Sequence, residues 1–81
     1  MKMKDSPKYY TKDLYLTAYL MSKGLTLLNV DRTDPRHVVF IFEDSAERPR
    51  LEKNFFQGNA YGALSPFVDS LRRAKALLWK D

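Results

Sequence analysis

The chain has 81 residues, of which 44% are hydrophobic and 14% aromatic, and it carries a net charge of +4. This apolar content excludes wholesale disorder, and the length suits one small domain that buries roughly 60% of its extended surface. The sequence has no cysteine, which excludes a disulfide scaffold and a thiolate metal site. The basic charge is compatible with nucleic-acid binding, because Lys and Arg release counterions from phosphates, but it does not require it.

Residues 1–10 are predicted to form a flexible basic tail, and residues 11–81 a single α+β domain. The charged residues at the start are followed by no apolar region, so we expect no signal peptide. The longest apolar stretches are far shorter than the ~20 residues that span a bilayer. The expected location is therefore the cytoplasm.

The first predicted helix begins after Thr11, whose hydroxyl can accept a hydrogen bond from a free amide of the first turn. Asp13 suits the positive end of the helix dipole. The helix is expected to run to Lys23, and Gly24 to end it in a left-handed conformation.

Two strands are predicted next, at Leu25–Asp31 and His37–Glu43, and the turn chemistry of residues 32–36 joins them into a hairpin. Two strands alone are marginally stable in water. The second strand is apolar on both faces, which carry Val38, Phe40 and Phe42 on one side and Val39 and Ile41 on the other. We therefore expect a helix or a second subunit to cover the second face. A homodimer through this strand or through the first helix is predicted.

A second helix is predicted from a cap at Asp44 or Ser45 to Gly58, and a third helix from Ser65-Pro66. The third helix has a core-facing stripe within about 60° on a helical wheel, formed by Phe67, Leu71, Ala74 and Leu78. The predicted order is α-β-β-α-α, with the hairpin packed against the helices, and the fold class is α+β.

Residues typical of catalysis are sparse. His37 is the only histidine, so a metal cluster with several imidazole ligands is excluded. Glu43, Asp44 and Glu47 are oxygen donors suited to a hard cation, but acids at a helix start more often stabilise its dipole and cap its amides. The glycines are isolated and form no phosphate-binding loop. We predict a protein that is not an enzyme, with no cofactor and no metal.

The first helix carries the candidate binding surface. A helix that is hydrophobic nearly all round is buried on more than one side. Either this helix exposes a face that binds a protein or a second copy, or it is a central helix covered by the hairpin and the later helices. The favoured function is a non-enzymatic accessory protein that acts by contact with another protein. The predicted contact residues are Tyr15, Leu16 and Tyr19, with Lys12 and Lys23 at the rim.

The alternative function is nucleic-acid binding through the same helix. Tyrosines that stack on bases, interleaved with lysines that contact phosphates, are typical of single-strand-binding surfaces. Such a stripe, about 80° wide, is formed by Lys12, Tyr15, Tyr19 and Lys23, and the basic tail precedes it. Phosphate binding weakens steeply with salt, whereas an apolar protein interface does not, so salt separates the two functions.

Four short motifs resemble those of a family of short bacterial proteins of unknown function. They are Thr11-Lys12-Asp13-Leu14 followed by Gly24, Phe40–Asp44, Phe55–Ala60 and Phe67–Arg72. The resemblance covers nearly the whole chain, from Tyr10 to Leu78. It implies a single domain and a bacterial origin, and it transfers no activity, cofactor or site residue.

Overall fold

The computed structural model describes residues 7–79, which form an antiparallel sheet and helices packed on one side of it. In chain order the elements are β1 (Lys8–Thr11), α1 (Leu14–Ser22), β2 (Leu27–Asp31), β3 (Val39–Glu43), α2 (Arg48–Phe56) and α3 (Leu64–Leu78). The strand order across the sheet is β1-β3-β2. The α+β class, the order of the five predicted elements and the packing of the hairpin against helices are confirmed. One further strand, β1, precedes them.

The strand β1 corrects the predicted N-terminal tail. It pairs antiparallel with β3, so that Tyr9 lies opposite Phe42 and Thr11 lies opposite Phe40. The folded domain therefore begins by Lys8 rather than at Thr11. The sequence did not predict this strand because it has four residues and its partner lies far along the chain, which leaves no long local periodicity. Residues 1–6 of the predicted tail lie outside the described residues.

The central strand β3 has two different faces. Phe40 and Phe42 are completely buried, whereas Val39 and Ile41 on the opposite face are half-buried. Both edges of β3 are paired within the chain, one with β1 and one with β2. Neither edge of β3 is therefore free to pair with a strand of a second copy, so a homodimer through this strand would have to use its Val39 and Ile41 face.

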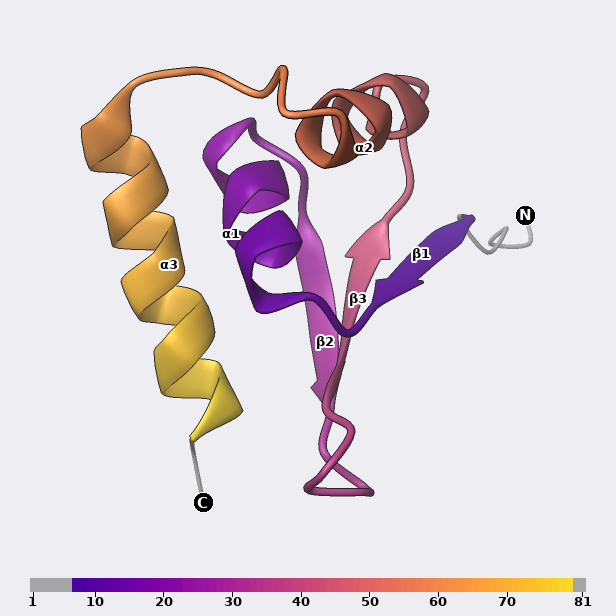
Figure 1. Ribbon diagram of the computed structural model, residues 1–81. Coiled ribbons are helices and arrows are strands. Elements are labelled where there is room, and N and C mark those ends of the chain that lie inside the picture. Colours follow the sequence, from indigo (N-terminus) through magenta and orange to yellow (C-terminus); the bar gives the residue numbers. More distant parts are fainter. Residues whose placement is uncertain (1–6, 80–81) are drawn as a thin grey trace, which may run out of the picture.

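The helix α1 is the central helix of the molecule. Figure 1 shows α1 between the sheet and α3. The C-terminal end of α1 and the helix α2 lie at the same end of the sheet. The five residues Leu16–Leu20 are all buried, and the core cluster joins Leu16 and Leu20 to Phe40 and Phe42. This confirms the prediction of a central helix that the hairpin and the later helices cover.

The ends of the helices differ in detail from the predicted ones. Glu47, rather than Asp44 or Ser45, is the N-cap residue of α2. The helix α3 begins one residue before Ser65, after the N-cap residue Ala63. Gly24 and Gly58 follow α1 and α2 with positive φ angles of 93° and 77°, as predicted. Between residues 7 and 79, no helix combines the length and the apolar composition that crossing a bilayer demands.

The helix α3 is held against α1 and tied to the sheet. Ser70 and Ala74 are buried on its inner side. At its C-terminal end, Nη1 of Arg32 donates a hydrogen bond of 2.9 Å to the carbonyl oxygen of Leu77. A positive charge at a free helix carbonyl also complements the negative end of the dipole. Arg32 thus connects the end of β2 to the last turn of α3.

Asp13, and not Thr11, is the N-cap residue of α1. Its Oδ1 accepts a hydrogen bond of 3.0 Å from the amide of Leu16. The hydroxyl of Thr11 instead accepts one of 3.1 Å from the amide of Asp13. An N-cap residue has an extended backbone and directly precedes the first helical residue. Asp13 meets both conditions, since α1 begins at Leu14.

The Asp13→Ala variant is expected to lose about 1 kcal/mol of unfolding free energy, because an orphan amide of the first turn loses its acceptor. Urea unfolding followed by circular dichroism measures this loss. Asp13→Asn is the matched control and should stay close to wild type, because asparagine caps as well as aspartate. Equal stability of Asp13→Ala and wild type would contradict the assignment of the cap.

Candidate functional site

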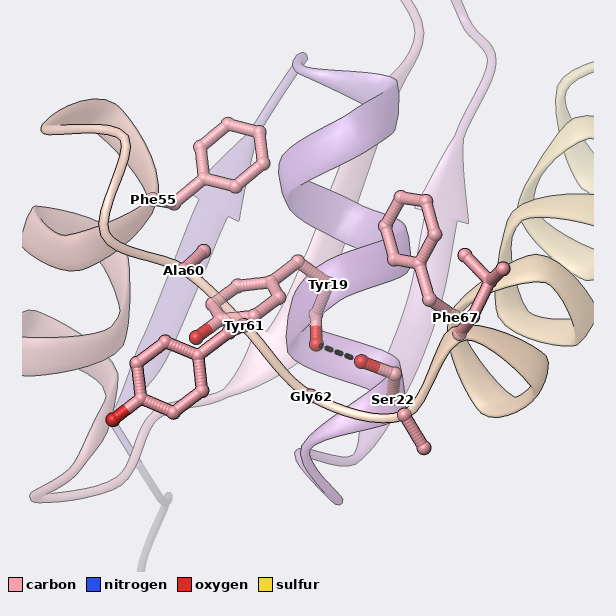
Figure 2. A pocket seen from close by; sticks show the side chains of 9 residues that line it. Tyr19, Ser22, Phe55, Ala60, Tyr61, Gly62 and Phe67 are labelled. Atoms are coloured by element: carbon pink, nitrogen blue, oxygen red, sulfur yellow. Dashed lines mark hydrogen bonds between the residues drawn. The ribbon is translucent and has the colours of Figure 1, made fainter.

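An apolar groove lies where α1, α2 and the start of α3 meet. Its volume is about 240 Å³, and the segment 60–63 crosses in front of it (Figure 2). The residues that line it are Tyr19, Ser22, Phe55, Ala60, Tyr61, Gly62, Ala63, Leu64 and Phe67. Most of these side chains are aromatic or aliphatic, so the groove offers apolar contact area and few polar partners.

The floor of the groove is continuous with the protein core. Tyr19 is only 7% exposed, and its ring centroid lies 5.7 Å from that of Phe55. Phe67 is half-buried and packs against the core cluster. The rim is exposed by contrast, since Tyr61 is 83% and Leu64 75% accessible to solvent. A rigid aromatic floor with an exposed apolar rim is typical of a surface that another molecule covers.

One positive charge borders the groove. The Nζ atom of Lys23 lies 5.6 Å from the ring centroid of Tyr19, within reach of a cation–π interaction. It also lies 2.9 Å from the position that a Cβ atom would occupy at Gly62. The missing side chain of Gly62 therefore leaves room for the ammonium group. The hydroxyl of Ser22 donates a hydrogen bond of 2.7 Å to the carbonyl oxygen of Tyr19, as Figure 2 shows.

The structure distributes the five predicted contact residues over four places. Tyr19 and Lys23 meet at the groove, as described above. Leu16 is 1% exposed and belongs to the core, so its side chain is not a surface contact. Tyr15 is 53% exposed and lies one turn before Tyr19. Lys12 precedes α1 at the helix end opposite Lys23.

Lys12 contributes to the electrostatics of the loop between β2 and β3. A hydrogen bond with His37 holds the pKa of Asp34 below its usual range, the amide of Arg36 lowers it further, and Lys12 adds a smaller electrostatic effect. The predicted stripe of alternating lysine and tyrosine does not form one exposed surface, because Tyr19 is buried within it.

Sequence reasoning missed most of the groove. Its remaining aromatic residues come from α2, the segment after it and the start of α3, namely Phe55, Tyr61 and Phe67. The available signal was the density of aromatic and glycine residues between Phe55 and Phe67. A short loop this rich in aromatic residues adds more apolar surface than a connection requires, and such surface marks contact sites.

A polar cluster connects β1, the end of β3 and α2. Arg48 donates two hydrogen bonds of 2.9 Å to the carboxylate of Asp44, through Nε and Nη2, and one of 2.9 Å from Nη1 to Glu52. Its guanidinium carbon lies 4.3 Å from the ring centroid of Tyr9. A fork-like pairing of this kind is stronger and more directional than a single ion pair. The cluster fixes α2 against the first strand.

Two of the three acidic residues considered as cation ligands form ion pairs with arginines instead. Both carboxylate oxygens of Asp44 accept hydrogen bonds from Arg48, which lowers the pKa of Asp44. Glu47 lies 3.7 Å from Arg50 in an exposed ion pair. Asp44 was expected to cap α2, and it pairs with Arg48 instead. Within residues 7–79, no three His, Asp or Glu side chains are grouped as metal ligands would be.

Comparison with known proteins identifies the family. A family model described as a domain of unknown function (DUF5659) matches residues 6–80, which is nearly the whole chain. The chain belongs to the DUF5659 family. No curated protein and no solved structure matches this DUF5659 chain. The predicted membership in a family of unknown function is thereby confirmed. Three residues of the four short motifs noted in the sequence, Phe55, Ala60 and Phe67, line the groove.

The polar cluster of this DUF5659 domain shifts the titration of Tyr9. Burial, followed by the neighbouring Glu52 carboxylate, raises the pKa of Tyr9 from 10.0 to about 12. The folded state therefore favours the neutral phenol. This contribution to stability is complete below pH 10 and is lost as the pH rises from 10 towards about 12.

We expect the unfolding free energy of wild type to fall more steeply than that of Tyr9→Phe between these two pH values, because phenylalanine has no proton to release. Urea unfolding at several alkaline pH values measures both slopes. The two proteins differ only in the Tyr9 hydroxyl, so the difference between the slopes reports this group. Identical slopes for wild type and Tyr9→Phe would contradict the assignment.

Proposed function

We propose that this DUF5659 domain is a non-enzymatic accessory protein that acts by binding another protein, with the apolar groove as its contact site. The observation that carries the proposal is the aromatic floor of the groove beside the exposed rim residues Tyr61 and Leu64. Aromatic anchors in a desolvated pocket contribute most of the binding energy in protein interfaces. Tyr61 and Leu64 would lose their solvent exposure when a partner covers them.

The size of the groove favours a protein partner over a small molecule. Small-molecule and cofactor sites typically enclose roughly 300–1,000 Å³ and bury most of the ligand. The groove holds about 240 Å³ and is bordered by side chains that project into solvent. One large apolar side chain of a partner fits such a volume, and the rim then excludes water around it. The proposal accordingly includes no cofactor and no catalysis.

The alternative, nucleic-acid binding, has less support. Stacking requires an aromatic face that a base can cover, and Tyr19 is 7% exposed with Phe55 and Lys23 next to its ring. Tyr15 alone would remain of the predicted stacking pair. We also propose a bacterial origin and a cytoplasmic location for the protein. Self-association remains part of the proposal, with the groove rather than β3 as the contact.

The proposal predicts that replacing the rim residues removes a bound partner. The tagged protein is purified from bacterial lysate with nuclease treatment, and the yield of any stoichiometric protein is measured. The Tyr61→Ser/Leu64→Ser variant should reduce this yield by about tenfold or more, because two exposed anchors of the interface are lost. Both positions are exposed, so the fold should be unaffected, which circular dichroism verifies.

The matched control is Tyr10→Ser/Leu28→Ser, which removes the same two residue types from exposed positions on the sheet. It should retain the partner. Light scattering of the purified protein decides whether the partner is a second copy. Retention of the partner by both variants would refute the groove as the contact site. Co-purification of nucleic acid alone, lost on nuclease treatment, would favour the alternative function.

A further inference from the structure

The helix α3 has more apolar surface than α1 covers. Its inner side carries the buried residues Ser70 and Ala74, together with three half-buried residues that pack against the core, Phe67, Leu77 and Leu78. On a helical wheel these five positions span about 100°. A helix packed on one neighbour needs an apolar side of about this width. Apolar residues outside this arc therefore call for a separate explanation.

A second stripe, the outer stripe, follows the adjacent side of α3. It consists of Leu64, Val68, Leu71, Lys75 and Trp79, which the spacing of four, three, four and four residues places within about 80°. Leu64 and Trp79 are 75% and 77% exposed. Val68 and Leu71 are half-buried, and among the described residues they are not in the group that packs against the core cluster.

The spacing of the outer stripe is that of a surface that receives another helix. The apolar anchors lie at i, i+4, i+7 and i+15, with Lys75 at i+11, and such a spacing matches the apolar side of an amphipathic partner lying along the helix. With 15 residues at about 1.5 Å per residue, α3 offers a contact about 22 Å long. Leu64 belongs both to the outer stripe and to the groove rim, so the two surfaces are continuous.

The charges on this surface are positive. Lys75 lies within the outer stripe and is exposed, and Arg72 lies next to it with a side chain that is 77% exposed. Among the described residues, Arg72 forms one ion pair, in which its Nη1 lies 4.0 Å from Oδ1 of Asp69. Both side chains of this pair are exposed. Such a pair contributes little and leaves the guanidinium able to bind another carboxylate. A partner with acidic residues beside its apolar side is complementary to this arrangement.

We infer that the outer stripe of α3 binds an amphipathic helix of another protein whose apolar side is bordered by glutamate or aspartate. The inference rests on the proposed protein-binding function and specifies the chemistry of the partner. A second copy of the chain that binds through its own α3 does not meet this description. In a two-fold pair of α3 helices, the residues near the middle face their own copies, so Arg72 would approach Arg72 and like charges would oppose the contact.

A synthetic peptide of about 16 residues, long enough to span α3 at about 1.5 Å per residue, tests the inference. It is helix-stapled, has a leucine stripe bordered by glutamates and contains no tryptophan. Trp79 is the only tryptophan of the chain, so its emission reports coverage of the outer stripe. We expect a blue shift that saturates with peptide and weakens with salt. The same peptide with lysines in place of the glutamates should bind at least about tenfold more weakly.

The charge-reversal variant Arg72→Glu/Lys75→Glu should lose the glutamate peptide and prefer the lysine peptide. Arg36→Glu/Lys53→Glu changes the same net charge at exposed positions away from the outer stripe and should behave as wild type. Equal binding of both peptides, an unchanged preference in Arg72→Glu/Lys75→Glu, or no emission change would overturn the inference. A blue shift with anionic phosphatidylserine vesicles but not with the glutamate peptide would overturn it too, because the surface would then bind lipid.

Partner capture from lysate separates this inference from the proposed function. Here Tyr61→Ser is the groove variant, because Tyr61 is not part of the outer stripe. Loss of the partner in both Tyr61→Ser and Arg72→Glu/Lys75→Glu supports both proposals. Loss only in Tyr61→Ser means that the inference fails and the proposed function stands. Loss in neither variant refutes both.

Discussion

The fold depends on the burial of the central strand β3 against α1. Phe40 and Phe42 are fully buried there, in contact with a helix that is itself covered on both sides. A three-stranded sheet is stable only when a hydrophobic face packs on something else, and α1 supplies that layer. Pairing of β3 with β1 on one edge and β2 on the other then satisfies its backbone. Every other element is positioned relative to this contact, α3 on the far side of α1 and α2 at its end.

The groove is a consequence of where α2 is held. Arg48 bonds Asp44 at the end of β3 and Glu52 within α2, and its guanidinium lies over Tyr9 of β1. These contacts set the direction of α2, which brings Phe55 against Tyr19 on α1. Because a partly buried network of this kind is directional, it orients one wall of the candidate site as well as stabilising the fold. The site therefore depends on residues that do not touch it.

Local signals in the sequence predicted the elements well, and non-local contacts account for what they missed. Gly24 and Gly58 mark helix ends because their backbones need positive φ angles. The β-branched and aromatic residues of β3 indicate a strand. β1 escaped prediction because its stability comes from pairing with β3. Non-local packing also explains why only part of the site was predicted. Tyr19 and Lys23 could be predicted because they lie on one helix. The packing of α2 and α3 brings the other aromatic residues of the groove to them, namely Phe55, Tyr61 and Phe67. Leu16 was assigned to the surface because a helix covered on two sides has the same composition as one with an exposed apolar face.

The central position of α1 also determines where apolar surface remains. A helix between two layers directs all its hydrophobic residues inward, whereas each outer layer has one neighbour and one free side. On the sheet, the free side carries Val39 and Ile41 half-buried, with Tyr10 opposite Ile41 and the charged pair Lys8 and Glu43 beside them. On α3, the free side carries Leu64 and Trp79 almost fully exposed and continues into the groove. Exposed apolar side chains of this size are unfavourable in water, and this is the physical reason for placing the proposed contact on the α3 side.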